Sequence, residues 1–306
     1  MKTILLVIFV VFLVFIAGCG SQEQQNQQEI YSGTDGIKMK FLTNTPPSEI
    51  FARSDLVVLI EYTNAGASPI SKGALYLTGY DPSYLFGTSY KSENFYDSRS
   101  GALKGKSIMY PQGETRIAEF QTKTNKQEHI DSFEQKLKLT ACYEYKTTAS
   151  TQVCIDPEPY IQGGGKKTCI PGLQSLSGGQ GAPVAVTKID ERIAGNTVYF
   201  DIHFKNMGSG DAFVGSPSNC YTSLSYSEIN RIEVTSVRLS NSGVSYCEPR
   251  LGSSIVLTNG EGFIKCYTTI PKTGDEYLTN LDIILEYSYR ESAPLKTINI
   301  LSAPGG

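Results

Sequence analysis

An internal repeat of short, strand-like segments most constrains how this chain can fold. The apolar segment 57–66 ends in Asn-Ala-Gly, and it matches segment 198–208, which ends in Asn-Met-Gly. Asparagine and glycine adopt the positive φ angles that a tight turn after a strand requires. The match therefore predicts that one strand-and-turn arrangement is used twice.

Three further matches follow in the same order along the chain. Leu75-Tyr76-Leu77 parallels residues 237–239, residues 113–117 parallel 260–264, and residues 139–146 parallel 283–290. Apolar and polar residues alternate in these segments, as half-buried antiparallel strands require. Residues 136–139 alternate as well, so the second half of segment 128–139 is predicted to be a strand. We therefore predict an all-β chain with two tandem β-sandwich domains.

The N-terminus carries a short apolar run, residues 4–17, behind the single basic residue Lys2. A run of this length is typical of a signal peptide, whereas a membrane-spanning helix usually needs about 20 apolar residues. The run ends in Ile16-Ala17-Gly18-Cys19, which resembles the lipobox of bacterial and some archaeal lipoproteins. This resemblance implies cleavage before Cys19 and a diacylglyceryl group on its thiol. An uncleaved signal anchor with an incidental cysteine is the alternative.

Residues 20–29 contain no apolar side chain to bury and are predicted to stay disordered. A flexible tether of about 15 residues would reach ~20 Å. We assign residues 1–18 to the signal peptide, 19–33 to a lipid-anchored tether, 34–160 and 183–303 to the two sandwiches, and 161–182 to a glycine-rich linker. The expected localisation is extracytoplasmic, at the cell surface and anchored to the membrane.

Six cysteines remain when Cys19 is assigned to the lipid. In an exported chain an even number indicates disulfides, whereas metal binding would call for Cys-x-x-Cys or Cys/His spacings that the sequence lacks. We predict Cys142–Cys154 across a hairpin that turns at residues 147–150, Cys247–Cys266 within the second domain, and Cys169–Cys220 between linker and domain. The main alternative joins Cys154 to Cys169.

The sequence nominates no catalytic or metal-binding residue and no cofactor. It has two histidines, and we expect His129 to lie on the surface and His203 to have a structural role in a strand. With 27 basic and 30 acidic residues and no basic cluster, the chain lacks the charge pattern of a nucleic-acid-binding protein. We therefore expect no enzymatic activity and no nucleic-acid partner.

A tyrosine-rich segment between residues 76 and 96 is the candidate for ligand recognition. Tyrosine contacts partners at a low cost in side-chain entropy, and loops on rigid sandwiches are common binding sites. The candidate ligand-binding residues are Tyr80, Tyr84, Tyr90 and Tyr96. The alternative is that these rings pack beneath a long loop, as Tyr76 is expected to do in the core.

The repeated motifs resemble the CARDB group of immunoglobulin-like domains. The matching residues are Asn64, Gly66, Pro111, Gly113, Glu114, Tyr143 and Tyr145 in the first copy, and Asn206, Gly208, Gly260, Glu261, Tyr287 and Tyr289 in the second. The resemblance covers most of residues 36–160 and 183–303, although the long aromatic segment and the cysteines depart from it. It implies immunoglobulin-like sandwiches that act as adhesion or spacer modules on bacterial and archaeal surfaces.

These observations predict a non-enzymatic surface lipoprotein that serves as an adhesion, binding or envelope-assembly module. Its expected partners are the membrane, through a lipid on Cys19, and a surface protein or glycan. A solute-binding lipoprotein serving a transporter is the alternative, although such proteins usually have α/β lobes. A surface hydrolase is a further alternative, which a broad substrate screen would reveal.

Overall fold

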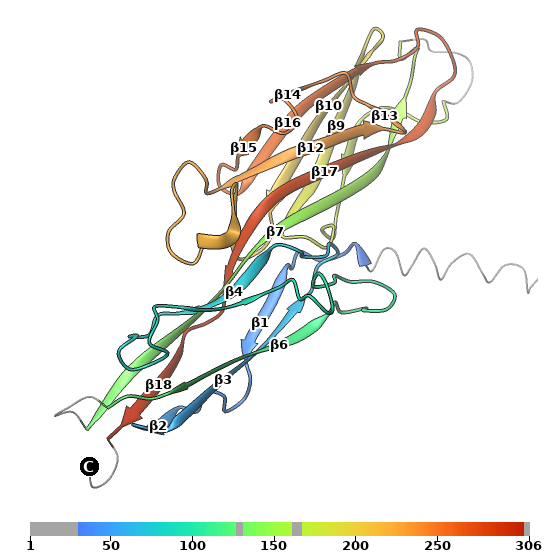
Figure 1. The fold of residues 1–306 in the computed structure, drawn as a ribbon. Coiled ribbons are helices and arrows are strands. Elements are labelled where there is room, and N and C mark those ends of the chain that lie inside the picture. Colours follow the sequence, from blue (N-terminus) through green and yellow to red (C-terminus); the bar gives the residue numbers. More distant parts are fainter. Residues whose placement is uncertain (1–29, 127–130, 161–166, 303–306) are drawn as a thin grey trace, which may run out of the picture.

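The computed structural model describes residues 30–126, 131–160 and 167–302. They form an elongated molecule in which two β-sandwiches lie end to end (Figure 1). The predicted immunoglobulin-like, all-β fold class is confirmed. Within the described ranges no helix is long and apolar enough to cross a bilayer. The predicted signal peptide, Cys19 and His129 lie outside the described residues.

The first sandwich has a three-stranded sheet in the order β1-β3-β6. Its strands are β1 (Ile37–Phe41), β3 (Asp55–Asn64) and β6 (Thr115–Lys123). Every second residue of β3 is buried, including Leu56, Val58 and Ile60. This alternation places one face of the sheet in the core and leaves the other toward solvent.

A single long strand, β7 (Ser132–Ile155), runs through both sandwiches. Its odd-numbered residues from Leu137 to Ala149 are buried, so one face of the strand lines both cores. Strand β17 (Tyr277–Ser292) pairs with residues 140–155 of β7, and β18 (Lys296–Leu301) pairs with residues 132–137. The two sandwiches therefore share a continuous sheet rather than a flexible connection.

The remaining strands complete the two halves of this shared sheet. On the first sandwich these are β2 (Glu49–Phe51), β4 (Gly73–Thr78) and β5 (Lys91–Asn94). On the second they are β11 (Asp211–Phe213), β12 (Arg231–Leu239), β13 (Ser242–Gly243) and β15 (Ser254–Val256). A 3-10 helix, η1 (Pro217–Asn219), lies in the loop between β11 and β12.

The second sandwich is closed by a five-stranded sheet in the order β14-β16-β10-β9-β8. Its strands are β8 (Leu173–Ser175), β9 (Val184–Ala194), β10 (Thr197–Asn206), β14 (Tyr246–Glu248) and β16 (Glu261–Thr269). The central strands β9, β10 and β16 correspond to β1, β3 and β6 of the first sandwich. The same order of strands in the two sheets agrees with the predicted repeat.

Equivalent tyrosines fix equivalent turns in the two copies. The hydroxyl of Tyr143 accepts a hydrogen bond from the N–H of Ile37, the first residue of β1, at 3.0 Å. The hydroxyl of Tyr287 accepts one from the N–H of Val184, the first residue of β9, at 3.1 Å. Each ring thus ties the closing strand of its repeat to the opening strand.

The second tyrosine of each pair holds the turn after the Asn-x-Gly motif. Tyr145 accepts from the N–H of Ser68 at 3.2 Å, and Tyr289 accepts from the N–H of Gly210 at 2.8 Å. Asparagine side chains complete both turns: Asn64 donates to the Ser68 carbonyl and Asn206 to the Gly210 carbonyl, each at 2.8 Å. The tyrosines of the two repeats also face one another across the shared sheet, Tyr143 opposite Tyr289 and Tyr145 opposite Tyr287.

Two predicted matches are displaced. Residues 113–117 are one place out of register with 260–264, because Ile60 lies opposite Ala118 whereas its counterpart Ile202 lies opposite Ile264. The other match is displaced by two residues. Leu77 lies opposite Leu139, whereas Val237 lies opposite Ile283, the counterpart of Leu139. Val237 is therefore equivalent to Leu77 and not to Leu75. A shift of two residues leaves each side chain on the same side of the sheet. The sequence pattern alone therefore does not distinguish the two registers.

The strand pairing does not follow the predicted domain boundaries. The C-terminal half of β7 belongs to the second sandwich, although it precedes the predicted boundary at residue 160. Conversely, β18 joins the sheet of the first sandwich, although it was assigned to the second. Part of the predicted linker is also built into the fold, because β8 pairs with β9 and Ala182 is buried. Residues 161–166 of that linker lie outside the described residues.

The three disulfides are Cys142–Cys220, Cys154–Cys169 and Cys247–Cys266. The last was predicted, and Cys154–Cys169 was the stated alternative. The predicted Cys142–Cys154 pair is wrong because residues 147–150 continue β7 and do not turn. Twelve residues of extended strand separate these cysteines by about 40 Å.

The predicted Cys169–Cys220 pair is wrong as well. Cys220 follows η1, and that loop packs on the outer face of the shared sheet, where Cys142 is buried with Tyr76 and Phe213. The Cys142–Cys220 disulfide therefore joins the middle of β7 to a loop of the second sandwich, next to the junction. Cys169 instead attaches the linker to the end of β7.

Candidate binding face on the second sandwich

The tyrosines predicted to bind a ligand do not form one site. Tyr80 is buried and packs against Phe86, with ring centroids 4.9 Å apart. Tyr84 packs against Phe133 at the start of β7, at 4.7 Å. Burial raises the pKa of Tyr80 to about 12, which is consistent with its place in the core. Both rings therefore stabilise the loop over the first sandwich.

Tyr90 and Tyr96 lie elsewhere and are partly exposed. Tyr90 packs against Tyr221 at 4.8 Å, and Tyr221 stacks on Tyr76 at 4.5 Å. These three rings lie near the Cys142–Cys220 disulfide and join the two sandwiches. Tyr96 is 57% exposed in the following turn. The packing alternative therefore describes Tyr80, Tyr84 and Tyr90 better than a shared recognition surface.

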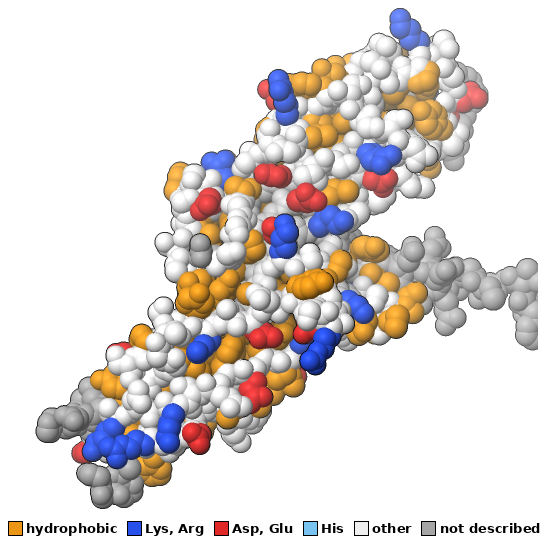
Figure 2. Space-filling view, viewed as in Figure 1, with side chains coloured by type: hydrophobic (Ala, Val, Ile, Leu, Met, Phe, Trp, Pro, Cys, Tyr) orange, Lys and Arg blue, Asp and Glu red, His pale blue; other side chains and the backbone are white. Residues whose placement is uncertain are grey.

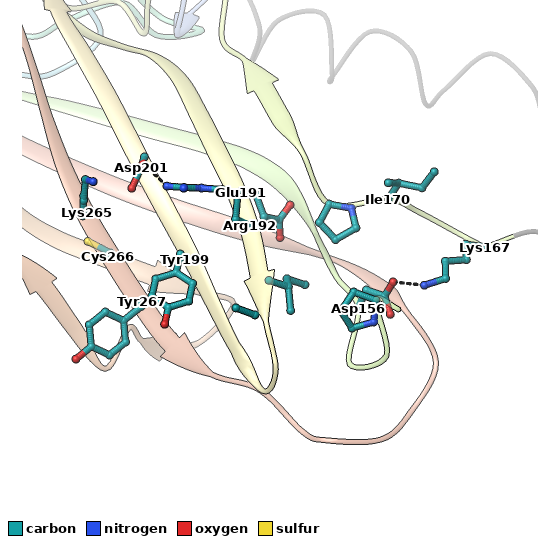
Figure 3. A pocket seen from close by; sticks show the side chains of 14 residues that line it. Asp156, Lys167, Ile170, Glu191, Arg192, Tyr199, Asp201, Lys265, Cys266 and Tyr267 are labelled. Carbon is teal, nitrogen blue, oxygen red and sulfur yellow. Dashed lines mark hydrogen bonds and ion pairs between the residues drawn. The ribbon is translucent and has the colours of Figure 1, made fainter. Parts of the chain in front are cut away.

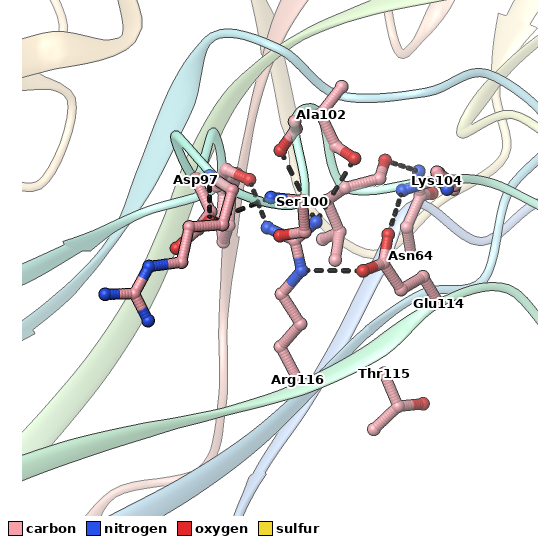
Figure 4. Close-up of polar contacts among 12 residues, drawn as sticks. Asn64, Asp97, Ser100, Ala102, Lys104, Glu114, Thr115 and Arg116 are labelled. Atoms are coloured by element: carbon pink, nitrogen blue, oxygen red, sulfur yellow. Dashed lines mark hydrogen bonds and ion pairs between the residues drawn. The ribbon is translucent and has the colours of Figure 1, made fainter.

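A half-buried ion pair holds the long loop that follows these tyrosines (Figure 4). Arg116 on β6 donates from Nε to Glu114 at 2.8 Å and from its terminal nitrogens to the carbonyls of Phe95 and Ala102. Glu114 also accepts from the N–H of Lys104 at 2.8 Å. Glu114, the glutamate of the predicted Gly-Glu turn, thus orders the loop that precedes β6 in the sequence.

The solvent face of the second sandwich presents a row of tyrosines. Tyr199 on β10 lies directly opposite Tyr267 on β16, which lies opposite Tyr246 on β14. The ring centroids are 5.8 Å and 5.3 Å apart, and the three side chains are between 38% and 43% exposed. We call this set the tyrosine row. Three adjacent strands therefore display a partly exposed aromatic surface.

A charged row and a second aromatic pair follow along the same strands. The charged row contains Asp201, Lys265 and Glu248, in register across β10, β16 and β14. Two residues further along, His203 lies opposite Phe263, with ring centroids 5.7 Å apart. The face thus alternates aromatic, charged and aromatic rows, because side chains two residues apart share one side of a strand.

A groove of about 980 Å³ adjoins the tyrosine row (Figure 3). One side is formed by Tyr199, Tyr267 and Lys265, and the other by the segment that carries Ile170 and Pro171. Asp201 forms an ion pair with Arg192 at its floor. A second hollow of about 610 Å³ lies around His203 and Phe263 and shares Lys265 with the groove. The larger groove has the volume of a small-molecule or oligomeric ligand site.

Glu191 is the buried acidic group of the groove. Its residue is 2% exposed, and its carboxylate accepts a hydrogen bond from the N–H of Cys154 at 3.1 Å. The other oxygen, Oε1, has no hydrogen-bond partner among the described residues. Burial raises the pKa of Glu191 to about 7, against the opposing effect of the Cys154 and Gly172 backbone groups. The groove therefore contains a carboxyl that changes charge near neutral pH.

The first sandwich lacks this aromatic face. The pair equivalent to Tyr199 and Tyr267 is Val57 opposite Gln121 on β3 and β6. Since both pairs occupy the same place in the repeat, the fold does not require aromatic rings there. The tyrosine row is thus a property of the second copy and a candidate for a specific function.

The described residues contain no group of three or more His, Cys, Asp or Glu side chains arranged to hold a metal ion. The groove is lined by partly exposed aromatic rings, by charged side chains that can form hydrogen bonds, and by one buried carboxyl group. These groups can bind a ligand without covalent chemistry. None of them was predicted from the sequence as a ligand-binding residue.

No family model matches the sequence, and no curated protein matches it. Among solved structures, the comparison found the partial N-terminal region of an enterococcal surface protein. It covers 85% of this chain and 84% of that chain, at 8% identity and a TM-score of 0.19. A likeness of this size carries no argument about function.

Proposed function

We propose that this protein is a non-enzymatic, lipid-anchored binding module outside the cytoplasmic membrane, and that it binds a glycan through the face around the tyrosine row. The observation that carries the proposal is the tyrosine row itself. It consists of partly exposed aromatic rings on three paired strands, beside a groove, at positions where the other copy of the repeat has no ring.

The chemistry of the face suits a saccharide. Sugar rings combine an apolar C–H face with an edge of hydroxyl groups, and so need flat apolar surface next to hydrogen-bonding side chains. Tyr199 and Tyr267 supply the flat surface, and Asp201 and Lys265 supply an acceptor and a donor one row away. Because paired strands position all four residues, little order has to be gained on binding.

Three disulfides support an oxidising compartment. The lipobox-like Ile16-Ala17-Gly18-Cys19 supports anchoring through Cys19. A non-reducing intact mass of membrane-extracted protein tests both points. We expect a chain that starts at Cys19, is heavier by a lipid and is lighter by six hydrogens. A full-length chain with free thiols would contradict the anchoring and the compartment.

A glycan array probed with the full chain tests the binding. We expect saccharide signals that disappear in the variant Tyr199→Val/Tyr267→Gln, which installs the Val57–Gln121 pair of the first sandwich. Tyr226→Val is the matched control, because this tyrosine is 94% exposed and lies outside the tyrosine row. Signals that survive the double substitution, or that fall equally in the control, would contradict the proposed face.

A further inference from the structure

A second surface, distant from the tyrosine row, has the properties of a membrane-inserting loop. Residues 104–114 leave the first sandwich and return to it just before β6. The base of the loop is closed by two hydrogen bonds: the Glu114 N–H donates to the Lys104 carbonyl at 2.9 Å, and the Lys104 N–H donates to the Glu114 carboxylate at 2.8 Å. The loop therefore has a fixed position.

A tight turn at the tip holds two large apolar side chains in solvent. Ser107 and Tyr110 exchange backbone hydrogen bonds of 2.9 and 3.1 Å, which places Ile108 and Met109 between them. These side chains are 76% and 83% exposed. A single exposed apolar residue is ordinary. Two adjacent ones at the end of an ordered turn form a small apolar surface that no other part of the described fold covers.

The loop lies beside the place where the described chain begins. Lys106 donates from Nζ to the carbonyl of Ser32 at 3.0 Å, and its backbone N–H donates to the Gly66 carbonyl at 2.7 Å. Figure 1 shows the loop before β6 projecting on the side of the molecule where the described chain begins. Cys19 lies eleven positions before Ile30, a length of chain that spans about 40 Å at most. A lipid on Cys19 would therefore allow the loop to reach the bilayer.

The charges of the loop fit a phospholipid surface. Residues 104–114 contain two lysines and one acidic residue, Glu114, whose carboxylate is paired with Arg116 at the base of the loop and away from its tip. Lys104 lies over the ring of Tyr110, with its Nζ 5.3 Å from the centroid, and Figure 2 shows apolar and basic side chains on this part of the surface. Basic side chains next to an inserted apolar tip are attracted to anionic headgroups.

We propose that Ile108 and Met109 insert into the membrane to which Cys19 is anchored. The inference rests on the proposed lipid anchor and adds a second point of attachment. A lipid on a single residue holds a protein at the membrane but does not by itself orient it. Attachment through the loop as well turns the junction of the two sandwiches toward the bilayer. The tyrosine row, near the far end of the second sandwich, then remains accessible to ligand.

The absence of tryptophan from the chain allows a direct test. The full-length protein is produced with Met109→Trp, purified from membranes and reconstituted into phosphatidylcholine vesicles with and without phosphatidylglycerol. Tyr226→Trp is the control, because Tyr226 is 94% exposed in the second sandwich. We expect a blue-shifted emission and quenching by brominated lipid for the tryptophan at position 109, stronger with phosphatidylglycerol, and neither effect at position 226.

Flotation of the same vesicles separates the two proposals. If both variants float but the tryptophan at position 109 stays unquenched and solvent-like, the anchor stands and the insertion of the loop is refuted. If neither variant floats, the anchor fails and the inference fails with it. Insertion is also refuted if position 226 is quenched as strongly as position 109. The variant Ile108→Ser/Met109→Ser should still float and fold, because both replaced side chains are exposed.

Discussion

Replacing Glu191 by glutamine should remove a pH dependence of stability that the wild-type chain shows between pH 4.5 and about 7. Burial raises the pKa of this carboxyl from its ordinary value of 4.5 to about 7. In that window the folded state binds the proton more tightly than the unfolded state. The stabilisation from the protonated form is therefore complete below pH 4.5 and is lost as the pH rises through about 7.

The magnitude follows from the shift and from relaxation around the buried carboxyl. One pKa unit corresponds to about 1.4 kcal/mol, so the full shift sets an upper limit of about 3 kcal/mol. Relaxation and water penetration around a buried charge lower its cost, so we expect about 1–2 kcal/mol. Glutamine keeps the acceptor for the Cys154 N–H and places a donor where the protonated carboxyl has one. It therefore mimics the protonated form.

The assay is guanidinium chloride unfolding of both proteins at a series of pH values, followed by circular dichroism. Below pH 4.5 the two unfolding free energies should agree, and above pH 7 the variant should be more stable by about 1–2 kcal/mol. The difference in unfolding free energy between the wild type and the variant does not contain the contributions of the other titrating groups, which are the same in both proteins. Equal curves throughout, or a variant that is less stable above pH 7, would refute the reasoning.

Three further substitutions test the fold. Removing the Cys142–Cys220 disulfide with alanine at both positions should cost about 4 kcal/mol in unfolding free energy, because it closes a loop with a sequence separation of 78; an unchanged denaturation midpoint would contradict this. Gly66→Ala should destabilise the chain by about 1–3 kcal/mol, since the new Cβ would lie 1.9 Å from the Tyr145 hydroxyl, and thermal unfolding will show whether it does. Burial raises the pKa of Glu114, but the hydrogen bonds from Arg116 and the Lys104 N–H outweigh it and lower the pKa below the ordinary value. Glu114→Gln should therefore destabilise the loop at neutral pH and have less effect as the pH falls below 4.5, measured by proteolysis of the loop.

The fold class and the repeat could be predicted because both depend on local patterns. Alternating burial along β3 and β17 follows directly from alternating residue types, and the Asn-x-Gly turns occur at equivalent places. The positive φ angles expected of these turn residues are not found, because neither Asn64 and Gly66 nor Asn206 and Gly208 adopt them. The pairing of β7 with β17 was not predictable in the same way. A strand pattern shows which side of a strand is buried, but not which distant strand lies beside it. For this reason residues 147–150 were misinterpreted as a turn.

The candidate binding face was not predicted, because the tyrosines between residues 76 and 96 form the most conspicuous aromatic cluster in the sequence. The signal was nevertheless present in the strands: Tyr199, Asp201 and His203 alternate with buried residues on β10, as Phe263, Lys265 and Tyr267 do on β16. Once the buried positions of a strand are assigned, aromatic residues at the alternating, solvent-facing positions are easily recognised. The groove itself depends on Ile170 and Pro171, which the Cys154–Cys169 disulfide brings to the sheet. That contact could not be read from the sequence.

Titration calorimetry of the strongest array saccharide against the full chain measures how much the tyrosine row contributes to binding. Two rings that each contribute about 1 kcal/mol predict a loss of about 30-fold in affinity for Tyr199→Val/Tyr267→Gln. Tyr199→Phe/Tyr267→Phe should retain most of the binding, because the rings remain. The account predicts this order of affinities with unchanged thermal stability in all three proteins. Equal affinities for the wild type and the valine/glutamine variant would contradict it.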